Sequence, residues 1–66
     1  MSVAKVIELS ATSGESFEDA IRAAITKASE TIRGITGAWV KEQKVDISNG
    51  QVTAFRVSLH VTFVLD

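Results

Sequence analysis

Five side chains between residues 39 and 60 have the chemistry to hold a small ligand: Trp39, Lys41, Gln43, Arg56 and His60. An indole offers a flat aromatic surface on which a planar ring can stack. The guanidinium of Arg56 can grip a phosphate or carboxylate with two parallel hydrogen bonds, and the amide of Gln43 can both donate and accept. These residue types predict a binding site for a planar or anionic small molecule.

Each of these residues also has a simpler structural interpretation. Trp39 is equally suited to a subunit interface, where tryptophan is enriched. For Arg56 we favour a hydrogen bond to Gln43 on the neighbouring strand, or an ion pair between subunits with Glu42, Asp46 or another acid. We expect His60 to pack or lie at an interface, and Lys41 to be solvated or salt-bridged.

Catalytic and metal-binding chemistry find little support in the sequence. Ser58 and His60 share one face of a strand, but no acid orients the imidazole and no oxyanion hole is indicated, so we expect no hydrolase and no catalytic residue. The chain has one histidine and no cysteine, and no metal ligand is predicted. Glu15, Glu18 and Asp19 could offer oxygens to calcium, but a helix amino terminus explains these acids more simply.

The clearest structural pattern lies in the last third of the chain. Between Thr53 and Leu65, within a third strand expected over Gln51–Leu65, apolar residues strictly alternate with mostly polar ones: Phe55, Val57, Leu59, Val61, Phe63 and Leu65. Since a strand turns successive side chains to opposite faces, this pattern predicts a long β-strand with one buried face. The polar face of that strand is where we expect function.

The preceding elements predict an α+β fold in the order β-α-β-β. We expect strands over Val3–Leu9 and Ala38–Ser48, and a helix over Phe17–Arg33 that ends at Gly34. Ser16 is the expected helix N-cap, with Ser13 as its rival. The Asn49-Gly50 pair predicts a two-residue type I′ turn between the second and third strands.

This hairpin predicts a register in which Ser48 faces Gln51. One face then carries the pairs Gln43–Arg56, Lys41–Ser58 and Trp39–His60, and the other carries Glu42–Val57, Val40–Leu59 and Ala38–Val61. A β-bulge would shift this pairing by one residue. With one helix to cover one face, we expect the other face to meet a partner subunit, a cavity or a ligand.

Size and charge limit the classes of protein. The 66 residues predict a single domain, 1–66, that buries only roughly 60% of its unfolded surface. Without disulfides, association of copies is the expected means of stabilisation. The net charge of −1 argues against a nucleic-acid partner, and no apolar run approaches the ~20 residues of a membrane span. No signal peptide is evident, so we expect a cytoplasmic protein.

Over essentially its whole length the chain resembles the dodecin family. The resemblance rests on the opening KVIELSATSGESFEDAI, the VKEQ after the helix and the ending FRVSLHVTFVLD. It implies a three-stranded antiparallel sheet that wraps one helix, and a hollow homododecamer assembled from such chains. It also implies a non-enzymatic protein that binds and stores a flavin (FMN, riboflavin or FAD).

The resemblance also implies where a flavin would bind, and this chain departs there. Dodecins stack the ring on a tryptophan early in the second strand and hydrogen-bond its polar edge with a glutamine of the third. When Val40-Lys41-Glu42-Gln43 is aligned with the family, these positions fall on Gly37 and Arg56. Trp39 lies two residues beyond the stacking position, so the chain is also similar to a branch without the stacking tryptophan, which includes the calcium type.

Overall fold

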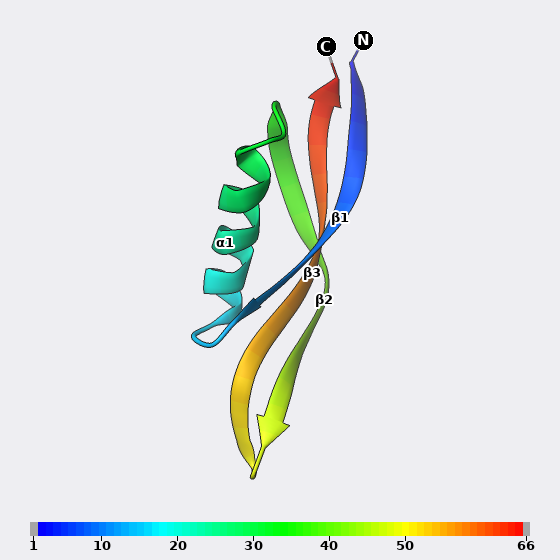
Figure 1. Ribbon diagram of the computed structural model, residues 1–66. Coiled ribbons are helices and arrows are strands. Elements are labelled where there is room, and N and C mark those ends of the chain that lie inside the picture. Colours follow the sequence, from blue (N-terminus) through cyan, green and yellow to red (C-terminus); the bar gives the residue numbers. More distant parts are fainter. Residues whose placement is uncertain (1, 66) are drawn as a thin grey trace.

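The sheet is built around its last strand. A computed structural model, which describes residues 2–65, contains β1 (Val3–Ser13), α1 (Phe17–Ser29), β2 (Ile35–Ser48) and β3 (Gln51–Leu65). The strands form one antiparallel sheet in the order β1-β3-β2. The order β-α-β-β and the α+β class are confirmed, and the strictly alternating strand lies in the centre (Figure 1).

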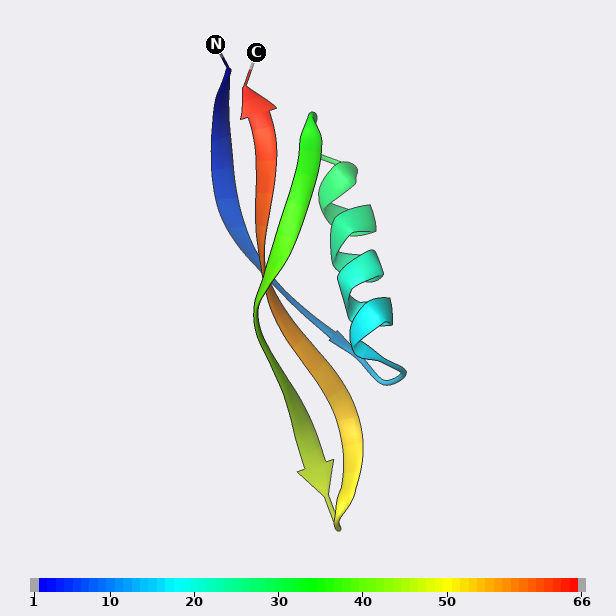
Figure 2. The same ribbon diagram turned by 180° about the vertical axis from the view of Figure 1, so that it is seen from behind.

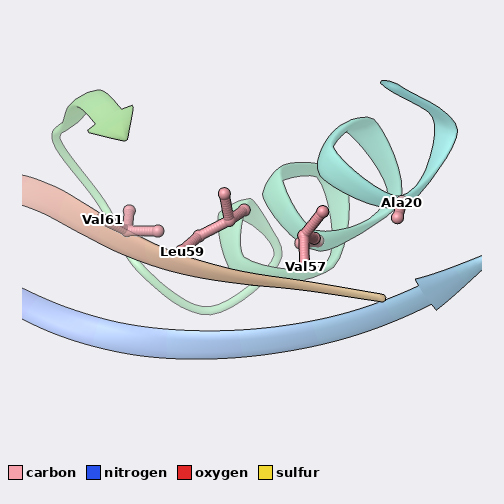
Figure 3. Packing of buried hydrophobic residues seen from close by; sticks show 5 residues of the cluster. Ala20, Val57, Leu59 and Val61 are labelled. Atoms are coloured by element: carbon pink, nitrogen blue, oxygen red, sulfur yellow. The ribbon is translucent and has the colours of Figure 1, made fainter. Parts of the chain in front are cut away.

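The core lies between β3 and the small-residue face of α1. Val57, Leu59 and Val61 are at most 1% exposed, and they point from β3 toward the helix beside Ala20 (Figure 3). Alanines on the helix allow this close approach, and partly buried residues of β1 and α1 pack around the cluster: Ile7, Leu9, Ala11, Phe17, Ile21, Ile25 and Ile35. The predicted buried face of the third strand is therefore confirmed.

The helix begins where the sequence predicts and ends earlier. The Ser16 hydroxyl accepts a hydrogen bond from the Asp19 amide at 2.9 Å, which confirms it as the N-cap. Ser13 acts beside it, because its hydroxyl accepts from the Glu15 amide and donates to the Asp19 carboxylate at 2.6 Å.

The predicted end of the helix at Arg33 is wrong, since α1 ends at Ser29. The amides of Glu30 and Thr31 donate to carbonyls three residues back, as in a tightened last turn. Gly34 adopts a φ of +77° and accepts a hydrogen bond from the Val64 amide at 3.0 Å. This glycine therefore starts the return toward β2 instead of capping the helix.

The contact at Gly34 predicts a measurable cost for any side chain. An added Cβ would lie 3.1 Å from the Val64 carbonyl oxygen, and the left-handed backbone itself costs a non-glycine residue roughly 1–2 kcal/mol. We expect Gly34→Ala to lower the free energy of unfolding by at least that amount in urea denaturation. Gly14→Ala is the matched control, because a Cβ there meets open space. Equal midpoints for the two variants would contradict this interpretation.

Two strands extend beyond their predicted bounds. β1 continues to Ser13, paired with Phe55, because small residues can continue the ladder beside the central strand. β2 begins at Ile35 instead of Ala38, with a register shift between Ile35 and Gly37. The turn is as predicted, with positive φ at Asn49 and Gly50 and Ser48 opposite Gln51.

Beyond the shift between Ile35 and Gly37, the hairpin register changes at two further places. Trp39–His60, Val40–Leu59 and Ala38–Val61 pair as predicted. Lys41 is an extra residue on β2 and Thr53 an extra residue on β3, so residues 42–46 pair one position away from the prediction. The pairs predicted for this stretch are therefore wrong: Gln43–Arg56, Lys41–Ser58 and Glu42–Val57.

The molecule is elongated, and its helix covers only part of the sheet. The hairpin of β2 and β3 projects past the amino-terminal end of α1, and the start of β1 lies beside the end of β3 at the opposite end (Figures 1 and 2). The projecting hairpin carries Ile47 and Val52, which are 64% and 49% exposed. Apolar side chains without cover inside one chain are typical of a surface that meets another molecule.

Candidate functional site

We call the side of the sheet that faces away from α1 the open face. Because Val57, Leu59 and Val61 point toward the helix, their neighbours on β3 point away from it. Pairing then places residues of all three strands on the open face: Val6, Glu8, Ser10, Thr12, Gly37, Trp39, Glu42, Lys44, Asp46, Arg56, Ser58, His60 and Thr62.

Trp39 and His60 form the aromatic part of this face. They are paired in the sheet, their ring centroids lie 4.9 Å apart, and the rings meet edge to face at 67°. The indole is 51% exposed, while the imidazole is only partly exposed. His60 thus packs against one side of the indole and leaves much of the flat surface of Trp39 accessible.

Glu8 joins this pair to Lys41. One carboxylate oxygen, Glu8 Oε1, lies 3.3 Å from Lys41 Nζ and 3.5 Å from His60 Nε2. Glu8 faces His60 from β1, and Lys41 reaches toward it from the bulge of β2 across the central strand. Glu8 was not among the predicted site residues. It lies between the inward-facing Ile7 and Leu9, and this alternation could have placed its side chain on the open face.

Arg56 lies farther along the open face and is engaged within its own chain. Its Nε donates to both carboxylate oxygens of Asp46, at 3.1 and 2.9 Å, and a terminal nitrogen donates to Thr12 at 3.4 Å. Arg56 therefore forms an ion pair with Asp46, one of the acids considered, but inside one chain. The prediction of Gln43 as its hydrogen-bond partner is wrong, and an ion pair between subunits stays a prediction.

Gln43 is the predicted site residue that the structure separates from the others. It pairs with Val57, whose side chain is in the core, so Gln43 lies on the helix side of the sheet. The bulge at Lys41 causes this, because one extra residue turns every following side chain to the opposite face. Within one chain Gln43 therefore cannot act beside Trp39.

The hollows on the surface differ in character. On the open face, a polar hollow of about 120 Å³ lies between Ser10, Glu42, Lys44, Arg56 and Ser58. This is smaller than the roughly 300–1,000 Å³ of ordinary ligand pockets, so one chain offers a surface for a ring without enclosing it. A larger apolar groove of about 480 Å³ runs between α1 and β1, and none of the predicted site residues line it.

The relatives decide the family. A family model described as Dodecin matches residues 3–66. The chain belongs to the dodecin family. It is 39% identical to the dodecin of Thermus thermophilus over 64 residues, which cover 97% of this chain and 93% of the relative. Membership in the dodecins supports self-assembly and the binding of a small ligand.

Solved dodecins share the fold along the whole chain. An arginine-to-alanine mutant of the T. thermophilus dodecin superposes with a TM-score of 0.93 at 38% identity, covering 100% of this chain and 98% of that one. The dodecin of Streptomyces davaonensis gives 0.91 at 31% identity, with coverages of 98% and 96%. The calcium dodecin of Mycobacterium tuberculosis gives 0.82 at 32% identity, with coverages of 97% and 91%.

Two properties of the described residues bear on other functions. Over residues 2–65, no helix is long and apolar enough to cross a membrane. Within the same range, His, Cys, Asp and Glu side chains do not gather in groups of three or more that could hold a metal ion. The acids at the start of α1 have other partners, since Asp19 accepts from Ser13 and Glu18 pairs with Arg22.

Proposed function

We propose that this dodecin assembles into a hollow homododecamer and binds a flat aromatic ligand on the open face, with flavin (FMN, riboflavin or FAD) as the first candidate. The observation that carries the proposal is the half-exposed indole of Trp39, held edge-on by His60. A planar ring stacked on this indole buries apolar surface on both partners. The role is one of binding and storage, without catalysis.

Assembly is supported by how little one chain buries. Six hydrophobic residues form the core, and three of them are alanines: Ala20, Ala24, Ala28, Val57, Leu59 and Val61. Larger apolar residues stay about half-exposed, among them Val3, Val6, Ile47 and Val52. A scaffold of this size ordinarily needs a further source of stability, and contact between copies supplies it. Two open faces meeting would also enclose a ring that one face only supports.

The residues fit a flat ring, but not at the positions that the family resemblance implies. Gly37 provides no side chain for stacking, and Arg56 is held by Asp46 where an amide is expected. Trp39 therefore has to stack the ring about two strand positions away, roughly 6–7 Å along β2. When bound, a flavin supplies the flat ring, and the chain supplies the stacking surface and the polar side chains around it.

The same departures support a second candidate function. A dodecin with Gly37 and an occupied Arg56 could assemble without flavin, as a purely structural or ion-binding particle. The M. tuberculosis neighbour is described as a calcium-chelating calcium dodecin. Stoichiometric flavin in the native particle would exclude this second candidate.

Replacing Trp39 tests the proposed function. We expect flavin fluorescence to be quenched when FMN is titrated with the protein, because the ring stacks on an indole. Trp39→Ala is expected to weaken binding by roughly 5- to 150-fold, since stacking of a flat ring on an aromatic side chain is worth about 1–3 kcal/mol. Trp39→Phe keeps an aromatic surface and is expected to retain most of the affinity. Absence of quenching by the unaltered protein would overturn the proposal.

A further inference from the structure

We propose that Glu8, Lys41 and His60 form an edge-recognition triad that reads the imide edge of a planar ring stacked on Trp39. An imide edge is the sequence carbonyl, N–H, carbonyl along one side of a heteroaromatic ring. This inference rests on the proposed function and makes it more specific, because it names the ligand chemistry and the polar residues that select it.

The triad is assembled from all three strands. Glu8 comes from β1, His60 from the central β3 and Lys41 from β2. Both nitrogens approach the same atom, with Lys41 Nζ at 3.3 Å and His60 Nε2 at 3.5 Å from Glu8 Oε1. The carboxylate therefore lies at the centre of the triad, next to the imidazole that touches the Trp39 ring.

Alternation along β2 brings the lysine into this group. Lys41 lies two residues after Trp39, so its side chain leaves the strand on the same face as the indole. Lys41 is also the extra residue of a β-bulge, unpaired between Val40–Leu59 and Glu42–Ser58. Bulges are over-represented beside functional sites. The stacking surface and the ammonium therefore lie together.

The hydrogen-bonding pattern of the triad complements an imide. Lys41 only donates, a carboxylate only accepts, and His60 Nε2 donates when it carries hydrogen. The triad thus offers donor, acceptor, donor, and an imide edge offers acceptor, donor, acceptor. Glu8 and Lys41 have opposite charges, so the selection acts through hydrogen bonds and not through net charge.

Glu8 also takes over a function that Arg56 cannot perform. The family resemblance implies an amide at Arg56, which could accept a hydrogen bond from the ring. A guanidinium has no acceptor, and this one is already bound to Asp46 and Thr12. Glu8 is the acceptor that the structure places in contact with His60, beside Trp39.

The test compares two uncharged ligands that differ at one atom. Lumiflavin carries the imide N–H, and 3-methyllumiflavin replaces that hydrogen with a methyl group. We expect the unaltered protein to bind lumiflavin at least tenfold more tightly, because the methyl group removes the N–H that would donate a hydrogen bond to the charged Glu8 carboxylate. Neither ligand has a phosphate, so anion binding elsewhere on the sheet does not contribute.

Variants of Glu8 assign the discrimination to the triad. In Glu8→Val, which keeps a good strand residue, we expect the affinity ratio of the two ligands to fall to within about twofold. Glu8→Gln retains an acceptor oxygen and is expected to keep most of the ratio. Glu42→Val removes a different acid from the open face and should leave the ratio unchanged.

The outcomes separate this inference from the proposed function. If the unaltered protein binds both ligands equally and Trp39→Ala still weakens both, the triad does not read the imide, while ring stacking on Trp39 stands. An unchanged ratio in Glu8→Val, or an equal loss in Glu42→Val, overturns the inference in the same way. If the unaltered protein binds neither ligand, both proposals are wrong.

Discussion

Leu59→Ala is expected to unfold the isolated chain and to weaken the assembly with it. Leu59 is 1% exposed and lies at the centre of the cluster between β3 and α1. Truncating such a side chain lowers the free energy of unfolding by about 2–5 kcal/mol, because buried apolar surface is lost and the cavity left behind closes only partly. A core in a chain this small rarely supplies more than about 3–5 kcal/mol in total.

Leu65→Ala is the matched control for this prediction. It is the same substitution on the same strand, but Leu65 is 48% exposed. Urea denaturation followed by circular dichroism, at one fixed protein concentration, compares the two variants. We expect a much lower midpoint for Leu59→Ala, and similar midpoints would mean that the core does not lie where the structure puts it.

The double substitution of Gly37 to Trp and Arg56 to Gln is expected to raise flavin affinity. The family resemblance implies a stacking tryptophan and a ring-edge glutamine at these positions. An added Cβ at Gly37 meets open space, and Gly37 lies on the open face opposite Thr62. One further stacking contact is worth about 1–3 kcal/mol, so we expect a gain in affinity of roughly 5- to 150-fold.

Two single variants and one control show which substitution causes the gain in affinity. Gly37→Trp alone is expected to provide most of it, and Arg56→Gln alone rather little, because the ring is held mainly by stacking. Gly14→Trp adds an indole in the loop before α1, at a site that is equally open. An equal gain from Gly14→Trp would show a non-specific effect of tryptophan. No gain from the double variant would mean that the open face does not bind flavin in the way that the family resemblance implies.

Much of the fold could be predicted from local patterns. The alternation from Phe55 to Leu65 indicated a strand with one buried face, and Asn49-Gly50 indicated the turn that fixes its partner. The sequence also indicated a helix from Phe17 onward, with Ser16 as its N-cap. These features depend on residues that are close together in the chain, which is why they could be predicted from the sequence.

The candidate site was less predictable because it depends on interruptions in the ladder. Neither Lys41 nor Thr53 belongs to a residue type that requires a bulge, yet both are extra residues in the pairing. Their effect is large, since residues 42–46 of β2 pair one position away from the prediction and turn their side chains to the opposite face. Gln43 thereby leaves the open face, and Asp46 comes within reach of Arg56.

Glu8 was missed because its role depends on strand order. The hairpin fixed how β2 pairs with β3, but nothing local specified that β1 would pair with the other edge of β3. Once β1 lies there, Glu8 faces His60 and meets Lys41 across the central strand. Trp39 and His60 were predicted together because they pair within the hairpin, in a stretch where the register was preserved.

Native mass spectrometry of the purified protein, with and without FMN, tests most directly whether this dodecin is a flavin-binding particle. We expect a particle of twelve chains whose mass increases by whole flavin units when FMN is added, and a Trp39→Ala particle of twelve chains that gains far fewer. A twelve-chain particle whose mass does not change when FMN is added would contradict flavin binding and favour assembly without flavin. A particle of any other chain number would contradict the dodecamer itself.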